Sequence, residues 1–362
     1  MSEIIDSAYK FGCGRYRQEK CLISKAGEEI KRFGKKAFII GGETALSITE
    51  EKLCRSLNEN GIEFLVQSYA GQCSHDGADI MSEKLKKEKC DMVVGVGGGK
   101  IMDFAHLIAA KVCVPVINIP TSSATCAAYT SLSVLYDEFG KTVGNFYQEI
   151  ETNAVLVDTE IMVKQPKRLL FSGWLDALAK FIEMKNGKTD IDITGLNMDV
   201  YTASILAKHT YDNLIELLPK AEEAIENGKA TEDFEKFIYL AIPVTGIISG
   251  ISKGFGQSAL AHELYYCVRT LFTQEALSAL HGEIVGIGLL AQTIYNGCCD
   301  NLLMLENTMK AYGAPTRLNE IGIRNTEENF KSIYELVLKS PFVTHDNEHL
   351  EKFTEALRYI MC

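Results

Sequence analysis

Three consecutive glycines followed by a lysine form the first candidate site. The stretch GVGGGKIMDFAH (95–106) follows a short, apolar, β-branched run at 91–96 that is typical of a buried strand. It leads into residues 100–111, whose apolar positions share one helical face. Glycines at such a turn let a ligand approach the backbone, and a helix N-terminus offers N–H groups to an anion. The loop therefore predicts phosphate binding at Gly97, Gly98, Gly99 and Lys100.

The loop alone does not identify its ligand. A Walker loop requires glycine at position 94 and Ser or Thr at 101, where this chain has Val94 and Ile101. The dinucleotide fingerprint GxGxxG requires glycine where Lys100 stands. A tight turn without a ligand is the alternative, because glycine often serves only the geometry of a turn.

An aspartate and two histidines form the second candidate site. Asp176 lies in GWLDALAKFIE, His262 in GQSALAHELYY and His281 in SALHGEIVGIG. An aspartate inside an apolar helical face is costly unless it is paired or bound to a cation. Either histidine alone would more often be structural. Together, the three would make a three-ligand site with one open position, the arrangement of a catalytic divalent metal such as zinc.

Two halves of the chain position these residues. In the first, strands are predicted at 36–40, 62–66, 91–96, 114–119 and 154–157, helices at 46–59, 76–88 and 100–111, and a hairpin over 134–146. This alternation predicts a parallel sheet with helices on both faces. In the second, helices are predicted at 169–186, 195–216, 232–251, 258–271 and 282–296. We expect an α/β, Rossmann-like domain over 1–162, an all-α domain over 163–362, and a site between them.

Composition limits the class of protein. The 362 residues are 46% apolar and 23% charged, which is typical of a globular chain with room for two domains. A net charge of −11 without a basic stripe argues against nucleic-acid binding. The absence of a basic leader and of a run of about 18 apolar residues predicts neither a signal peptide nor a membrane span. The eleven cysteines, with no CxxC pair, indicate reduced thiols in a cytoplasmic protein.

Taken in order, the motifs resemble the glycerol dehydrogenase branch of the metal-dependent (iron-containing, or group III) alcohol dehydrogenases. They are GVGGGKIMD (95–103), PTSSATCAAYTSLSVLY (120–136), GWLDALAKFIE (173–183), SALAHE and LHGEIVGIG. The resemblance covers nearly the whole chain. It implies a homo-oligomeric, NAD- or NADP-dependent oxidoreductase that interconverts a small alcohol or polyol and its carbonyl compound.

The resemblance also implies cofactor contacts. The loop from Gly97 to Lys100 would bind the pyrophosphate of a nicotinamide cofactor, and Asp103 would order that loop. Thr121 and Ser122 would contact adenine and ribose. The nicotinamide pocket would be lined by Thr130, Leu132, Val134 and Tyr136. The two aliphatic residues could equally be strand core, since alternating apolar residues need no ligand.

The resemblance further implies that the catalytic metal ligands are Asp176, His262 and His281. Iron-binding members have a further histidine one helical turn after the aspartate, and here that position is Lys180. Three ligands resemble the zinc-type glycerol dehydrogenases, so we expect Zn²⁺, with another divalent ion as the alternative.

Two further departures concern the substrate and the cofactor. Cys126 stands where glycerol dehydrogenases commonly have an aspartate that contacts the polyol. A thiol suits a vicinal diol poorly and makes the pocket less acidic, so a hydroxycarboxylate is the alternative substrate, with Arg269 or Lys253 as candidate partners for its carboxylate. Gly42 stands where NAD-selective relatives have an aspartate near the ribose 2′-hydroxyl. Unless Glu43 replaces that aspartate, we expect NADPH to be accepted.

Two rival classes fit less well. The 3-dehydroquinate synthases share this fold but have a DSSIGGKTG stretch where this chain has AAYTSLSVLYDEFGK. A non-catalytic nucleotide-binding protein is the other alternative, and the intact Asp176, His262 and His281 argue against it.

Overall fold

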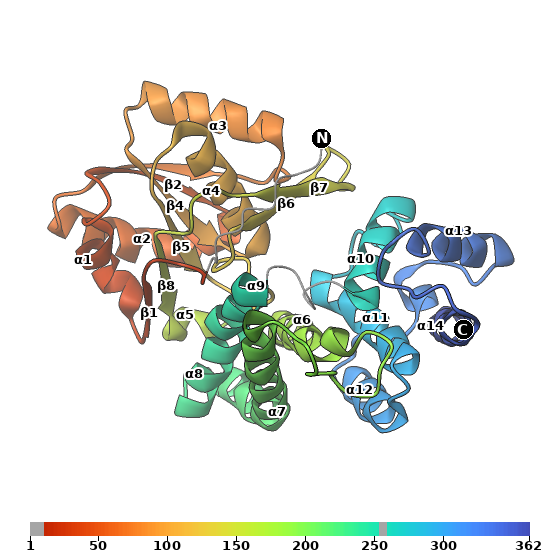
Figure 1. Cartoon of the computed structure of the whole chain (residues 1–362). Helices are drawn as coiled ribbons and strands as arrows, with labels where there is room; N and C mark the ends of the chain where they lie inside the picture. Colours follow the sequence, from red (N-terminus) through yellow and green to blue (C-terminus); the bar gives the residue numbers. More distant parts are fainter. Residues whose placement is uncertain (1–10, 253–258) are drawn as a thin grey trace.

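A six-stranded parallel sheet carries the first half of the chain (Figure 1). The computed structural model describes residues 11–252 and 259–362, and its strand order is β1-β8-β5-β4-β2-β3. The strands are β1 (Tyr16–Glu19), β2 (Lys36–Gly41), β3 (Glu63–Ser68), β4 (Met92–Gly97), β5 (Val116–Pro120) and β8 (Ala154–Asp158). The central strands are buried on both faces, which explains their nearly continuous apolar sequences.

Alternate residues of each central strand serve opposite faces of the sheet. Ile39 and Val94 belong to a core cluster with the helices α1 (Ala26–Ile30) and α2 (Glu43–Glu59). Their neighbours Phe38 and Val93 belong to a second cluster, with α3 (His75–Lys87) and α4 (Gly99–Val112). The sheet is therefore covered on both sides, as the alternation of strands and helices predicted.

The order of the strands reverses at β2, which pairs with β3 on one side and β4 on the other. Gly41 is paired with Val96, so the loops that begin at Gly42 and Gly97 leave neighbouring strands at the same level. Ligands of open parallel sheets bind beside such a reversal, at the carboxyl ends of the strands. The topology alone thus points to these two glycine loops.

A separate antiparallel hairpin, β6 (Leu132–Tyr136) and β7 (Thr142–Tyr147), projects from this lobe. The hairpin expected over 134–146 is confirmed, and the expected strands and helices of this half are confirmed with small shifts of their ends. The edge strand β1 was not expected from the sequence.

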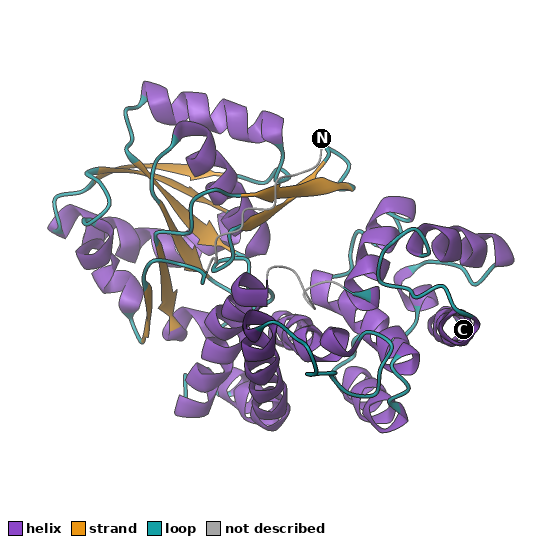
Figure 2. Ribbon diagram, in the orientation of Figure 1, coloured by secondary structure: helices purple, strands orange, loops and turns teal. Residues whose placement is uncertain are grey.

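The second half of the chain is helical, and the residues described after β8 contain no strand (Figure 2). The helices are α5 (Thr159–Met162), α6 (Lys167–Lys185), α7 (Met198–Glu226), α8 (Glu232–Tyr239), α9 (Thr245–Ser252), α10 (Leu260–Leu271), α11 (His281–Tyr295), α12 (Cys299–Ala311), α13 (Glu327–Val337) and α14 (Asn347–Met361). The expected fold class is confirmed. The boundary expected after residue 162 falls at the end of α5.

The single helix expected over 232–251 is interrupted by a π-helical turn, η2 (Leu240–Val244), which contains Pro243. Proline lacks the N–H that a regular helix needs, and a π turn accommodates that loss. Glu232–Ser252 is long and apolar enough to cross a membrane, but 72% of its apolar window is buried inside the fold. It is accounted for as a core helix.

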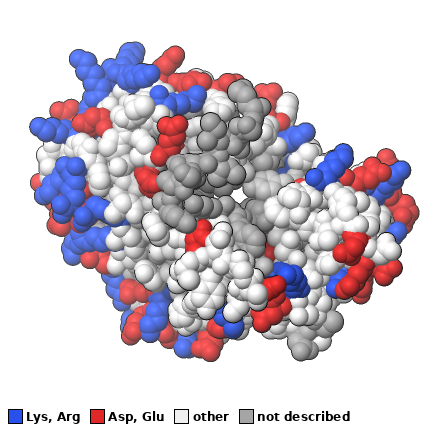
Figure 3. Space-filling model, in the orientation of Figure 1, with Lys and Arg blue, Asp and Glu red and all other residues white. Residues whose placement is uncertain are grey.

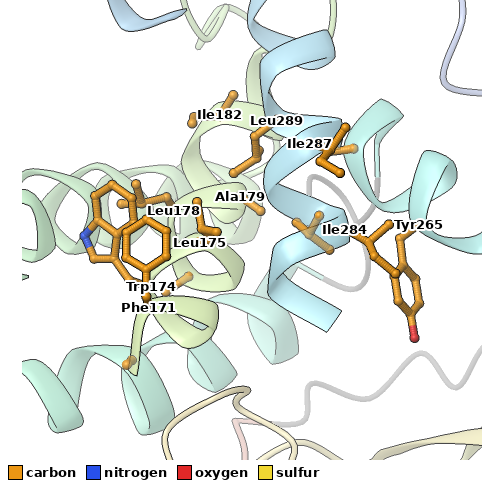
Figure 4. Close-up of a cluster of buried hydrophobic side chains, with 14 of the residues drawn as sticks. Phe171, Trp174, Leu175, Leu178, Ala179, Ile182, Tyr265, Ile284, Ile287 and Leu289 are labelled. Carbon is orange, nitrogen blue, oxygen red and sulfur yellow. The ribbon is translucent and has the colours of Figure 1, made fainter. Parts of the chain in front are cut away.

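The core of the helical lobe is built where α6 crosses α11 (Figure 4). Phe171, Trp174 and Leu178 of α6 are buried with Ile284 and Leu289 of α11, and the Trp174 indole N–H donates to the Leu214 carbonyl at 2.9 Å. Apolar burial on this scale fixes the two helices against each other. Both also carry residues of the second candidate site.

Candidate active site

The triple-glycine loop connects the carboxyl end of β4 to the start of α4. Gly97 has a φ of +154°, in the range that favours glycine. A Cβ on Gly99 would lie 2.7 Å from the Thr125 hydroxyl, so a side chain there would require Thr125 to move. The Thr121 N–H donates to the Gly97 carbonyl at 2.9 Å, and a Cβ on Gly98 would meet the Ser122 hydroxyl at 3.5 Å. The structure thus brings Thr121 and Ser122 against the loop, beside a helix N-terminus suited to phosphate.

Gly42 lies beside this loop, at the carboxyl end of β2 and immediately before α2. Its φ of −71° is open to any residue, and a Cβ there would have nothing within 4 Å. Glu43, the residue that could have replaced the missing aspartate, is exposed in the first turn of α2. The position therefore has room for a bulky cofactor group.

Asp103 makes other contacts than the loop-ordering ones expected from the sequence. Its buried carboxylate accepts the Val134 N–H at 3.3 Å, and its backbone carbonyl accepts the Ser133 hydroxyl at 2.9 Å. Burial raises the pKa of Asp103 well above its usual range. Through these two hydrogen bonds, Asp103 holds β6 against α4.

The strand β6 alternates between its two faces. Ser133 and Leu135 are buried, whereas Leu132, Val134 and Tyr136 are half-buried on the opposite face, and Thr130 just before the strand is half-buried too. Of these residues only Leu135 is a buried member of the sheet's core cluster. Leu132 and Val134 are therefore not the strand's main core residues and are partly accessible.

Asp176, His262 and His281 converge on one point. Asp176 Oδ1 lies 3.4 Å from His262 Nε2 and 3.3 Å from His281 Nε2, and the three candidate ligand atoms lie within 4.8 Å of one another. Asp176 and His262 are buried, and His281 is half-buried. One carboxylate oxygen and two imidazole nitrogens are a donor set that fits zinc or ferrous iron.

Opposing effects act on the charges of these groups. Burial disfavours an ionised Asp176, but hydrogen bonds from His262 and His281 hold its pKa well below the usual range. Burial also disfavours a charged His262, but the nearby carboxylate of Glu183 and the hydrogen bonds with Asp176 and Glu183 raise its pKa to about 9. Burial lowers the pKa of His281. The surroundings of Asp176 thus favour its anionic form, the form in which a carboxylate binds a cation.

Glycines in α11 allow the helices to approach closely enough for this convergence. A Cβ on Gly282 would lie 1.9 Å from the Ser172 carbonyl oxygen of α6, and one on Gly288 would lie 2.6 Å from the Ala261 carbonyl oxygen of α10. No larger residue could occupy either position without moving the backbone. The glycine next to His281 thus sets the distance between α11 and the helix that carries Asp176.

Glu183 supports the site and was not expected from the sequence. Its Oε2 lies 2.5 Å from His262 Nδ1, and its Oε1 accepts the N–H groups of Ala259 and His262 at 2.7 and 2.9 Å. A carboxylate on Nδ1 fixes the tautomer of a metal-ligating histidine and directs Nε2 to the metal. The signal available in the sequence was its position seven residues after Asp176, on the same helical face.

Lys180 and Cys126 lie in the same buried neighbourhood. Lys180 is only 5% exposed, and its charge is among the influences that lower the pKa of Asp176. Burial and, to a smaller extent, the charge of Asp176 raise the pKa of Cys126 to about 12, and the charge of Lys180 acts in the opposite direction. A Cβ on Gly173 would lie 1.7 Å from the Ser123 carbonyl oxygen, so α6 packs directly on the segment that carries Cys126.

A pair of tyrosines connects the hairpin to a candidate metal ligand. The hydroxyls of Tyr136 in β6 and Tyr265 in α10 are 3.3 Å apart. The ring of Tyr265 packs edge-on against His281, with 4.3 Å between their centroids. The structure thus links Tyr136, expected at the nicotinamide, to His281. Tyr265 was missed in the sequence, although it follows His262 by three residues.

Arg269 and Lys253 were the two side chains expected to bind a substrate carboxylate. Arg269 donates to the carbonyls of Ala276 and Ala279 at 2.8 and 2.7 Å, which secures the segment leading to His281. Lys253 lies outside the described residues.

The sequence and the fold are similar to those of known proteins. The model of the family "iron-containing alcohol dehydrogenase" matches residues 13–159. The chain is 32% identical to glycerol dehydrogenase of Thermotoga maritima over 314 residues, 86% of this chain and 84% of that protein. It is 28% identical to hydroxycarboxylate dehydrogenase A of Escherichia coli K12 over 291 residues, 80% and 78% of the two chains. The crystal structure of glycerol dehydrogenase from Schizosaccharomyces pombe superposes with a TM-score of 0.82 at 23% identity, over 97% of this chain and 89% of that one.

Fold and site together define an oxidoreductase of alcohols and carbonyl compounds. The chain belongs to the iron-containing alcohol dehydrogenase family, whose members depend on NAD(P) and bind a metal. Figure 3 shows both acidic and basic side chains among the described residues of the visible face.

Proposed function

We propose that this enzyme holds a divalent cation with Asp176, His262 and His281 and uses NAD or NADP to interconvert a small alcohol or polyol and its carbonyl compound. The convergence of the three side chains, with His262 fixed by Glu183, carries the proposal. Residues 1–162 would hold the nucleotide and residues 163–362 the cation. We also propose a homo-oligomer, which light scattering would test.

Each group of residues has a part in this reaction. When bound, the cation would polarise the substrate oxygen and the nicotinamide would exchange hydride with the adjacent carbon. The start of α4 and the loop from Gly97 to Lys100 would bind the pyrophosphate. The half-buried face of β6, with Leu132 and Val134, would lie against the nicotinamide and exclude water. Glu183 and Tyr265 would hold the two histidine rings in place.

Zinc is the cation that the site supports best. The protein offers one oxygen and two nitrogens, and Lys180 stands where a fourth ligand would be, leaving one position for substrate. Metal analysis of the purified protein, followed by reconstitution of the apoprotein with Zn²⁺ or Fe²⁺ alone, tests this choice. Activity restored by Fe²⁺ but not by Zn²⁺ would contradict it.

The variant His281→Ala tests the proposed function. It should lose bound metal and at least about 10³-fold in turnover, because a divalent ion cannot be held firmly by two ligands here. The matched control is His209→Ala, which removes an exposed histidine of α7. Circular dichroism should show both variants folded. Full activity in His281→Ala, or equal losses in the two variants, would end the assignment.

A further inference from the structure

Two successive tyrosines of α10 contact the hairpin that projects from the first lobe. The Tyr265 hydroxyl lies 3.3 Å from the Tyr136 hydroxyl in β6, and the Asn145 amide group in β7 donates to the Tyr266 hydroxyl at 3.5 Å. In the view of Figure 4, the Tyr265 hydroxyl points away from the apolar cluster of the helical lobe. The hairpin is thus in direct contact with the helix that carries His262.

Tyr265 is also the neighbour that holds the His281 ring. The Glu183 carboxylate fixes His262 through Nδ1, whereas no described residue forms a hydrogen bond with Nδ1 of His281. The His281 ring instead packs against the fully buried Tyr265 ring, with 4.3 Å between the centroids and 70° between the planes. The orientation of this candidate ligand therefore depends on where the Tyr265 ring lies.

The other side of the contact is built into β6. The register of the hairpin shifts between Leu135 and Tyr136, and such irregularities re-aim side chains beside active sites. The Val134 N–H is bonded to the Asp103 carboxylate of α4, the helix that begins in the glycine loop. Leu132, Val134 and Tyr136 share the half-buried face of the strand. A nucleotide held by the glycine loop and lying on this face would order the strand that carries Tyr136.

We propose that the contact between Tyr136 and Tyr265 couples the two sites, so that the nucleotide and the cation each strengthen the binding of the other. This inference rests on the proposed function, and it makes Tyr265 a positioning residue. A nucleotide that orders β6 would hold Tyr136 against Tyr265, and thereby the ring beside His281, so the cation would bind to a site that is already ordered. Coupling between two sites is reciprocal, so the cation should favour the nucleotide by the same factor.

Binding titrations measure this coupling without turnover. Competition with a fluorescent chelator gives the dissociation constant of Zn²⁺, with and without saturating NADH or NADPH, whichever binds the wild type more tightly. The fluorescence of that nucleotide gives its own dissociation constant on metal-free and zinc-loaded protein. In the wild type, each ligand should tighten the other at least about fivefold, and the two factors should agree. A variant that loses affinity uniformly keeps this factor, so damage to one site alone does not imitate a loss of coupling.

Tyr136→Phe and Tyr265→Phe each remove one hydroxyl of the contact and keep the ring. Each should lower the coupling factor to below about twofold, and the double variant should lower it no further, because each hydroxyl acts through the other. Tyr266→Phe is the matched control, because it makes the same change at the next residue of α10, whose hydroxyl contacts Asn145 instead of Tyr136. This variant should keep the wild-type factor. Circular dichroism and melting temperature verify that each variant is folded.

The outcomes separate this inference from the proposed function. A wild-type factor below about twofold, separate and additive losses in Tyr136→Phe and Tyr265→Phe, or an equal loss in Tyr266→Phe would overturn the coupling. If the zinc-loaded wild type still oxidised an alcohol, the proposed function would stand without it. A wild type that bound neither zinc nor nucleotide would refute both.

Discussion

Glu183→Gln is the variant whose effect follows most directly from the geometry. Glu183 receives three donors on two oxygens: His262 Nδ1 at 2.5 Å on one, and the Ala259 and His262 N–H groups at 2.7 and 2.9 Å on the other. Glutamine has a single acceptor oxygen, so at least one donor would face an NH₂ group in the buried site. An unsatisfied buried donor costs about 1–3 kcal/mol. The negative charge that supports His262 would be lost as well.

We therefore expect Glu183→Gln to weaken metal binding about 10- to 100-fold, or about 1.4–2.7 kcal/mol. Competition with a fluorescent zinc chelator of known affinity measures this change. Glu263→Gln is the matched control, since it makes the same substitution at the residue after His262. An unchanged dissociation constant in Glu183→Gln, or an equal change in the control, would refute the idea that Glu183 orients a metal ligand.

Three further predictions concern other parts of the site. Lys180→His should tighten metal binding at least about tenfold in the chelator assay, because it restores a fourth ligand one turn after Asp176. An unchanged affinity would mean that residue 180 does not face the cation. The wild type should use NADPH within about 100-fold of NADH in kcat/KM. Gly42→Asp should shift this ratio toward NADH at least about tenfold, because an aspartate has room there, with nothing within 4 Å of its Cβ. An unchanged ratio would exclude Gly42 from cofactor choice. Gly282→Ala should lower the unfolding free energy by about 1–3 kcal/mol or more, because its Cβ would lie 1.9 Å from the Ser172 carbonyl oxygen, whereas Gly42→Ala should be nearly neutral in the same denaturant titration.

The features that could be predicted from the sequence are those encoded locally. The apolar runs that become β2, β4 and β8 and the glycine loop at 97–99 follow directly from strand and helix periodicity. The hairpin of β6 and β7 was expected for the same reason. Asp176 was recognisable because a carboxylate on an apolar helical face is unusual. The order of the motifs then pointed to the family.

The features that escaped prediction depend on contacts between distant segments. The partner of Glu183 is 79 residues away, so nothing in its own helix distinguishes it from an ordinary polar residue. In the sequence, Gly282 and Gly288 indicate only a flexible helix. Their role is visible only in the structure, where each glycine packs against the backbone of another helix, at Ser172 and Ala261. The strand β1 has only four residues, too short for a periodic signal.

One face of α6 carries three charged residues of the site, and two of them have separable roles. Asp176, Lys180 and Glu183 are spaced by four and three residues, which places them on the same side of the helix. Asp176 would ligate the cation, and Glu183 would only hold another ligand, His262, in place. At saturating metal, Glu183→Gln should therefore keep kcat within about tenfold of the wild type, while Asp176→Asn, which removes a ligand, should lower kcat at least about 10³-fold. If the two variants lost the same share of kcat at saturating metal, separate roles for Asp176 and Glu183 would have to be abandoned.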